Sequence, residues 1–187
     1  MIKRIFLNWH RYILWALLSA IFWAWIVMLV SDAPMKKKVV IYADLPEIES
    51  GPLEVALEKD KPKNIRFVEA ALFDNVIFDS TKILYGDLYL IPESDVEEYL
   101  ASFTAFDPAE FPGQTFYESE GKTYGILVYD AETGPRFGEA CIRYPEERCY
   151  LFFNSDSLHI GEWNGSADDA AITVARNFLQ LEQGVQP

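Results

Sequence analysis

A long uncharged stretch near the N-terminus constrains the fold of this chain more than any other feature. Residues 13–30 read ILWALLSAIFWAWIVMLV, and Ser19 is their one weakly polar side chain. As a helix rising 1.5 Å per residue, this stretch would extend roughly 27 Å, close to the thickness of a bilayer's hydrocarbon core. Four of the five tryptophans also lie near it: Trp9, Trp15, Trp23 and Trp25. The sequence therefore predicts a transmembrane helix over residues 13–31, which would hold the chain in the bilayer.

A cleaved secretory signal is the alternative for this segment, because a charged start before an apolar stretch has the same outline. Three features favour an uncleaved signal anchor. The apolar run is longer than the usual signal core, no A-x-A-like site follows it, and Pro34 would lie directly after the nearest cut, at Ala33. No cysteine follows the helix closely, so a lipid-modified cysteine anchor is not expected.

The charge of the chain is unevenly divided. The formal net charge is −13, but residues 39–187 alone hold 10 bases and 28 acids, a net of −18. A surface this acidic repels phosphate backbones, so we expect no nucleic acid partner. A well-solvated surface is the ordinary interpretation of such a charge, and attraction of cationic partners is the alternative.

The chain has room for one ordinary domain beyond its anchor. Half of its residues are hydrophobic, which is enough for a core. We expect a short cytoplasmic N-terminus (1–12), the transmembrane helix (13–31), a basic linker (32–38), an acidic domain (39–183) and a tail (184–187).

Short apolar runs alternate with helical patterns inside the expected domain. Strands are predicted over residues 39–43, 65–71, 87–91, 115–118, 123–129 and 149–153. Helices are predicted over residues 52–60, from Pro92 onward with Ser94 and Glu97 as a capping box, and from near Ser166 onward with Asp169 completing a cap. This alternation predicts the α/β class (or α+β), with a mixed, partly parallel sheet flanked by helices.

The two cysteines, Cys141 and Cys149, lie in the segment GEACIRYPEERCYLFF. Strand-like runs flank a polar loop there, and in a hairpin the two thiols would face each other closely enough to bridge. Disulfides persist in oxidising compartments, so this pairing would place the domain outside a bacterial-type cell membrane. Two reduced core cysteines are the alternative. The positive charges flanking the apolar stretch are balanced and give no orientation by themselves.

Patterns for catalysis or metal binding are missing from the sequence. It contains no phosphate-binding glycine loop, no H-E-x-x-H and no G-x-S-x-G motif. His10 and His159 lie far apart, and the cysteines lack C-x-x-C spacing, so no metal site is expected. His159 lies in a predicted surface loop, where a lone histidine is usually structural or incidental. We expect no cofactor and no catalytic residues.

The order of several segments resembles the extracellular solute-binding proteins of ABC transporters. The matching segments are VVIYADL, DLYLIPESDVEEYL, YGILVYD, YLFFNSDS and DDAAITVARNFLQL. The strand YGILVY lacks the proline often found in that family. Family members enclose a ligand between two lobes in a chain about twice this length, so the resemblance implies a shortened, single-lobe-sized form.

The resemblance implies that a small solute is the ligand. In open α/β sheets a ligand binds beyond the carboxyl ends of the strands, which points to Asp44, Glu93 and Ser94. A turn role for Asp44 and a helix cap role for Ser94 are the alternatives. We therefore expect a membrane-anchored, extracytoplasmic binding module for a small solute or a membrane protein partner. The alternative is a non-catalytic structural or accessory subunit that works through protein contacts.

Overall fold

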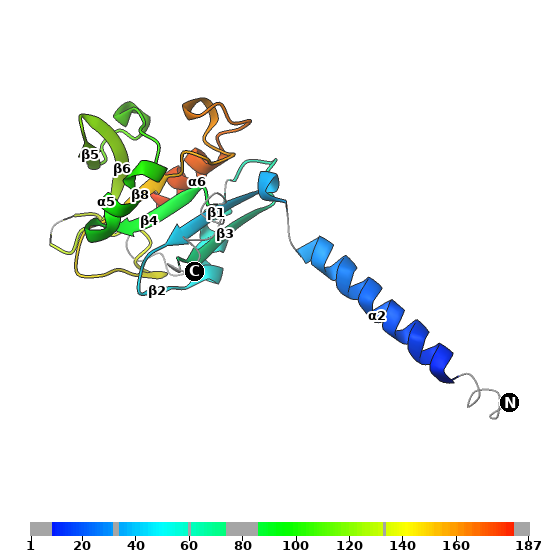
Figure 1. The fold of residues 1–187 in the computed structure, drawn as a ribbon. Helices are drawn as coiled ribbons and strands as arrows, with labels where there is room; N and C mark the ends of the chain where they lie inside the picture. The colour runs from blue at the N-terminus through cyan, green and yellow to red at the C-terminus, as the bar shows by residue number, and fades with distance from the viewer. Residues whose placement is uncertain (1–8, 32–33, 60, 74–85, 133, 182–187) are drawn as a thin grey trace. The chain divides into compact units, whose positions relative to one another are not determined.

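The computed structural model of the chain describes residues 9–31, 34–59, 61–73, 86–132 and 134–181. The chain divides into two compact units, Met1–Pro34 and Met35–Pro187. The first unit contains the apolar helix α2, and the second contains a small α/β domain (Figure 1).

The N-terminal helix α2 is one continuous helix, Trp9–Ser31. Its segment Trp9–Val27 has 19 residues and a mean hydropathy of 1.4, so it is long and apolar enough to cross a membrane or to act as a signal anchor. Its large apolar side chains are exposed, which suits a helix surrounded by lipid. The helix begins four residues before the predicted span 13–31, and the expectation of an apolar N-terminal helix is confirmed.

The domain is built on a six-stranded sheet with the strand order β3-β1-β4-β8-β6-β5 (Figure 1). Its strands are β1 (Lys38–Ala43), β3 (Phe67–Leu72), β4 (Leu88–Pro92), β5 (Phe116–Ser119), β6 (Lys122–Tyr129) and β8 (Cys149–Phe153). β1 pairs in parallel with β3 and β4, whereas β4–β8, β8–β6 and β6–β5 are antiparallel. The predicted α/β class, with one small domain and a partly parallel sheet, is confirmed.

The pairing directions of the strands define two opposite edges of this sheet, where the strands begin or end. β1, β3, β4 and β6 run in the same direction, so their last residues meet at one edge, which we call the carboxyl edge. Their first residues meet at the opposite, amino edge. Ligands of open α/β sheets bind beyond the carboxyl ends of the strands, so the two edges have different functional expectations.

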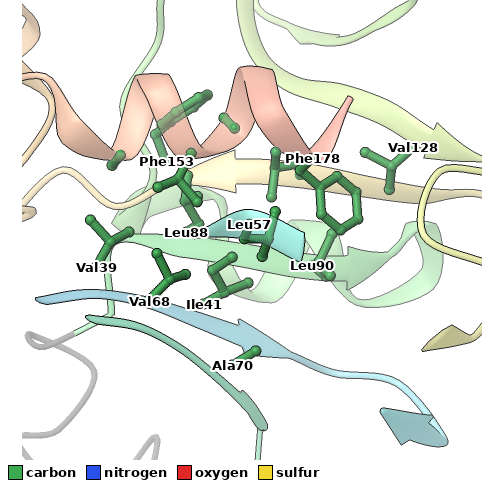
Figure 2. Close-up of a cluster of buried hydrophobic side chains, with 14 of the residues drawn as sticks. Val39, Ile41, Leu57, Val68, Ala70, Leu88, Leu90, Val128, Phe153 and Phe178 are labelled. Atoms are coloured by element: carbon green, nitrogen blue, oxygen red, sulfur yellow. The ribbon is translucent and has the colours of Figure 1, made fainter. Parts of the chain in front are cut away.

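The main core lies between one face of the sheet and the helices α3 (Ser50–Leu57) and α6 (Ala170–Phe178). Figure 2 shows Phe178 of α6 and Leu57 of α3 close to Leu90 of β4. All three side chains are fully buried. Because neighbouring residues of a strand point to opposite faces, Tyr89 belongs to a second cluster on the other face, beneath helix α5 (Val96–Tyr99).

The hairpin between β5 and β6 follows the prediction. Glu120 and Gly121 form its turn, and both have positive φ, 52° and 74°. Two successive positive φ values belong to the type I′ turn, whose twist matches that of the two strands it joins. The glycine therefore fits its position, whereas Glu120 adopts a conformation that is uncommon for a residue with a side chain.

Both predicted helix caps are wrong. Ser94 lies in the short 3-10 turn Glu93–Asp95, and α5 begins after it without a side-chain cap. The C-terminal helix α6 begins at Ala170, four residues later than predicted. The Ser166 hydroxyl instead accepts the backbone N–H of Ile160 at 2.9 Å and donates to the Asp168 carbonyl at 3.3 Å. Ser94 and Ser166 use their hydroxyl groups for hydrogen bonds within loops. The same hydroxyl groups are therefore not available to cap a helix.

The predicted disulfide is also wrong, since Cys141 and Cys149 are both free. The run after Cys141 forms the short strand β7 (Ile142–Arg143), which pairs antiparallel with β2 (Glu47–Ile48) in a separate two-stranded sheet. Cys149 begins β8 of the main sheet, where it lies opposite Pro92 and Tyr129. The two cysteines thus border different sheets and do not face each other across a hairpin.

Candidate functional site

The residues predicted to bind ligand lie at the carboxyl edge. Asp44 follows β1 directly, and Glu93 and Ser94 follow β4, the parallel neighbour of β1. The backbone N–H of Asp44 donates to the Leu90 carbonyl at 2.9 Å, which extends the pairing of the two strands beyond β1. These residues therefore follow the carboxyl ends of β1 and β4 as predicted, and their binding of a ligand stays a prediction.

Asp44 sits among other acids. Partial burial raises the pKa of its carboxyl above the ordinary value, and the charges of Asp95 and Glu98 raise it further. Like charges close together disfavour the ionised form and would repel an anion at the same place. The surroundings of Asp44 are therefore compatible with a cation and incompatible with a phosphate or carboxylate ligand.

Glu93 and Ser94 have partners within the domain. The Ser94 backbone N–H donates to Glu147 Oε2 at 3.0 Å, and its hydroxyl donates to Glu147 Oε1 at 3.2 Å. The backbone N–H of Glu93 donates to the Arg148 carbonyl at 2.8 Å. These bonds join the end of β4 to the loop that precedes β8, so they have a structural role that needs no ligand.

A cavity of about 340 Å³ lies at the carboxyl edge, and Asp44, Glu93 and Ser94 are not among the residues that line it. It is lined by Glu47, Glu49, Tyr129, Glu139, Ala140, Cys141, Ile142, Arg143 and Tyr144. Tyr129 ends β6 and Glu47 begins β2, which follows β1 in the chain, so the cavity is bounded by segments that leave the carboxyl ends of two strands. A cavity of this size can hold a small organic molecule.

Acidic side chains outnumber basic ones on the cavity wall. Three glutamates line it against the single guanidinium of Arg143. Arg143 Nη1 lies 3.8 Å from Glu47 Oε2, and Arg136 Nη1 lies 3.1 Å from Glu139 Oε1. In the described part of the chain no Lys or Arg is paired with Glu49, which is exposed. Glu49 is therefore the wall carboxylate with most freedom to meet a cationic ligand.

Two stacked tyrosines give the cavity a rigid side. The rings of Tyr129 and Tyr144 lie 4.4 Å apart with an interplanar angle of 5°. The Tyr144 hydroxyl donates to the Phe137 carbonyl at 2.6 Å. Burial is the main cause that raises the pKa of Tyr144 well above its usual range, and the charge of the nearby Cys149 raises it further. Tyr144 therefore stays neutral, and the two stacked rings present flat aromatic surfaces, which suit contact with an organic cation.

The thiol of Cys141 lies on the cavity wall without the features of a reactive cysteine. Partial burial raises its pKa above the ordinary value, and the charge of Glu49 raises it further. The thiolate, and not the thiol, is the nucleophile and the metal ligand. Cys141 therefore contributes a small neutral surface to this cavity.

A buried polar network occupies the opposite, amino edge of the sheet. Asp87, just before β4, accepts the Val40 backbone N–H at 2.9 Å and the Ser157 hydroxyl at 2.6 Å. Ser157 Oγ in turn accepts the backbone N–H of His159 at 3.0 Å. The His159 ring contacts Asp168 and is only 1% exposed, so its predicted position in a surface loop is wrong.

This network does not have the geometry of a Ser-His-Asp catalyst. The Ser157 hydroxyl donates to Asp87, and the ring nitrogens of His159 contact Asp168 Oδ1 and the Met35 carbonyl. A catalytic histidine must accept the proton of the serine hydroxyl, and this ring is directed elsewhere. Burial raises the pKa of Asp87, while its two hydrogen bonds oppose that effect. The network ties β1, β4 and the loop before α6 together.

What is known of this chain's function rests on the geometry of its described residues. In the parts of the chain that the structure covers, no group of three or more His, Cys, Asp and Glu side chains is placed to hold a metal ion. The cavity at the carboxyl edge is the feature best suited to a ligand. Comparison of the chain with protein-family models, with curated proteins and with solved structures gave no match.

Proposed function

We propose that this chain is a membrane-anchored binding module whose acidic domain holds a small solute outside the cell membrane. The cavity of about 340 Å³ at the carboxyl edge of the sheet carries this proposal. Its location agrees with the general position of ligand sites in open α/β sheets. The apolar helix α2 and the resemblance to extracellular solute-binding proteins support the anchor and the binding role.

The cavity wall favours a cationic solute such as an amine. Glu49 can accept charge-assisted hydrogen bonds from an ammonium group, which are roughly twice as strong as bonds between neutral groups. The stacked pair of Tyr129 and Tyr144 adds an aromatic surface that attracts organic cations. An anion would meet three glutamates and gain only Arg143, whose guanidinium already lies near Glu47.

The placement outside the cell rests on the resemblance alone. The two cysteines are not bonded, so they give no evidence for an oxidising compartment. The basic residues that precede the apolar stretch 13–30 (Lys3, Arg4 and Arg11) and those that follow it (Lys36, Lys37 and Lys38) are balanced in the sequence. Protease treatment of intact cells tests the orientation: the acidic domain should be digested from outside if the N-terminus is cytosolic.

The ligand is best sought by thermal unfolding of the full chain in nanodiscs against amines, basic amino acids, sugars and peptides. A ligand that binds the folded state alone must raise the unfolding midpoint. Glu49→Gln should abolish the shift produced by an amine, and its side chain is exposed, so folding should be unaffected. Glu118→Gln, also exposed and away from the cavity wall, removes the same charge and should leave the shift intact.

Two outcomes would contradict the proposal. The absence of any shift with the whole library would argue against a solute-binding module. A shift that survives Glu49→Gln and also survives Glu139→Gln would place the ligand outside this cavity.

A structural or accessory subunit is the second candidate, and one feature of α2 favours it. Ala16, Ala20 and Ala24 are spaced four residues apart, so they share one face of the helix. Small residues repeated in this way let two membrane helices approach closely. Replacing all three alanines with leucine keeps the helix apolar. Loss of a copurifying membrane protein, with ligand binding unchanged, would favour the accessory role.

A further inference from the structure

The imidazole of His159 lies between two parts of the domain that are far apart in the sequence. Its Nδ1 lies 2.7 Å from Asp168 Oδ1, in the loop before α6. Its Nε2 lies 3.0 Å from the carbonyl oxygen of Met35, the first residue of the 3-10 turn Met35–Lys37. Met35 follows the last residue of α2, Ser31, by only four positions. The ring therefore fixes the beginning of the domain, where the chain arrives from the apolar helix.

Both partners of this ring are hydrogen-bond acceptors. The Met35 carbonyl has no hydrogen to donate. Asp168 Oδ1 also accepts the Ala170 backbone N–H at 3.1 Å, and Asp168 Oδ2 accepts the Asn64 side chain at 2.9 Å. A neutral imidazole carries one N–H, whereas the imidazolium carries two. Both contacts are made only when His159 is doubly protonated.

The charges around the ring are suited to a buried imidazolium. Asp168 faces it from the loop before α6, and the charge of Asp87, just before β4, also acts on it. Ser157, in the same loop as His159, donates its hydroxyl to Asp87. Burial by itself would lower the pKa of His159. The bond to the Met35 carbonyl and the two aspartates outweigh burial, and the pKa is raised above its ordinary value.

We propose that His159 is a proton-operated clasp, which holds the turn Met35–Lys37, the first residues of the domain, in place when the ring is doubly protonated. When the ring loses a proton, its remaining N–H stays with the charged partner, Asp168, because charge-assisted bonds are the stronger ones. The Met35 carbonyl then loses its donor. The Arg66 backbone N–H still donates to the Lys37 carbonyl at 2.7 Å, so release is confined to the residues before Lys37.

The direction of the pH response follows from the raised pKa of His159. The clasp is closed below the ordinary histidine pKa and opens as the pH rises through the pKa of His159 in the folded protein. The hold of His159 on the turn Met35–Lys37 is therefore lost as the pH rises and restored in acid. This device is independent of the cavity at the carboxyl edge.

Two measurements on the full chain in nanodiscs test the clasp. Nuclear magnetic resonance of isotope-labelled histidine, from about pH 5 to about pH 9, should give a His159 titration midpoint above roughly 6.5, the value of free histidine. His10→Gln assigns the two histidine signals. Asp168→Asn keeps an acceptor oxygen and removes the charge, so it should move the midpoint down.

The second measurement is cleavage by trypsin after Lys36, which is exposed. Relative to an unstructured peptide of the same sequence, cleavage should become about tenfold faster above the His159 midpoint, the factor for one lost charge-assisted hydrogen bond. In His159→Gln the relative rate should not change with pH. A His159 midpoint at or below that of free histidine, or a cleavage rate that stays constant through the transition, would overturn the proposal.

Discussion

The carboxylate of Glu54 accepts the backbone N–H of Ala70 at 2.9 Å, and one helical turn later Glu58 does the same for Val68 at 3.1 Å. Two residues on a strand and four on a helix span similar lengths, about 6.6 Å and about 6.0 Å, so both bonds form at once. β3 is an edge strand of the sheet. The carboxylates of Glu54 and Glu58 cover two of its outward N–H groups. Such groups on an edge strand otherwise pair with another chain.

Removing both carboxylates should weaken the domain and expose this edge. Glu54→Ala with Glu58→Ala should lower the free energy of unfolding by about 3 kcal/mol, because each lost bond has a charged acceptor. Self-association should rise with protein concentration. Denaturant unfolding and light scattering measure the two effects, with Glu118→Ala as a control on an exposed residue. A double variant as stable and monodisperse as the control would contradict the edge-covering role.

Gly125 should not tolerate a side chain. A Cβ at this position would lie 2.6 Å from Phe152 Cε1 across the strand pair. Phe152 is fully buried and stacks on Phe103 with ring centroids 4.5 Å apart, so it cannot move aside easily. Gly125→Ala should lower the free energy of unfolding by about 1 to 3 kcal/mol, as overpacking of a core does.

Gly51→Ala is a matched substitution for which we expect the opposite change in the free energy of unfolding. Gly51 lies in helix α3, and a Cβ there would meet nothing within 4 Å. Gly51→Ala should raise the free energy of unfolding by about 0.5 to 1 kcal/mol, because alanine favours the helix. Chemical denaturation of both variants checks the pair, and equal effects in the two would contradict the packing described here.

The two cysteines should react very differently with a maleimide. Cys149 is fully buried, and burial raises its pKa to about 12, so it should react only after unfolding. Cys141 is partly exposed and should be modified first in the folded protein, without prior reduction. Mass spectrometry of the labelled chain, with Cys141→Ser as control, measures the order. Labelling that requires a reductant would show a disulfide and contradict the free thiols.

The unfolding free energy should depend on His159 in a defined pH window. The pKa of His159 is raised in the folded protein. Its contribution to the free energy of unfolding is therefore complete below the ordinary histidine pKa of about 6.5, and it declines as the pH rises through the folded pKa. The difference in unfolding free energy between the wild type and His159→Gln should therefore shrink with rising pH. Denaturant midpoints at several pH values give this difference, and a gap that widens with pH would reverse the sign predicted here.

The strands of the main sheet could be predicted because their signals are local. Leu88–Pro92 and Cys149–Phe153 are buried at every position and read as continuous apolar runs in the sequence. The apolar helix and the β5–β6 hairpin also have signals confined to a few residues. Their predicted bounds differ from the observed ones by a few residues at most.

The cavity and the polar network could not be predicted because they depend on contacts between distant segments. The pairing of Glu47 with Arg143 forms one wall of the cavity, and two-residue strands carry no recognisable pattern. At the amino edge, Leu158 is 44% exposed whereas Ser157 and His159 on either side are buried. This burial pattern is the reverse of what the polarity of the three side chains indicates, because the apolar one is exposed and the two polar ones are buried. Only the fold brings Asp87, Met35 and Asp168 to these two polar residues.

The strand order has a consequence for biosynthesis. β4 can pair with β1 as soon as it has been made, but these strands join β6 and β5 only after β8 has been made, because β8 lies between β4 and β6. Helix α6, which covers the main core, comes later still. Helix α2 leaves the ribosome long before either element, so it can engage the membrane while the domain still lacks its central pairing. The exposed edge of β4 in that interval makes this domain a natural client for a chaperone.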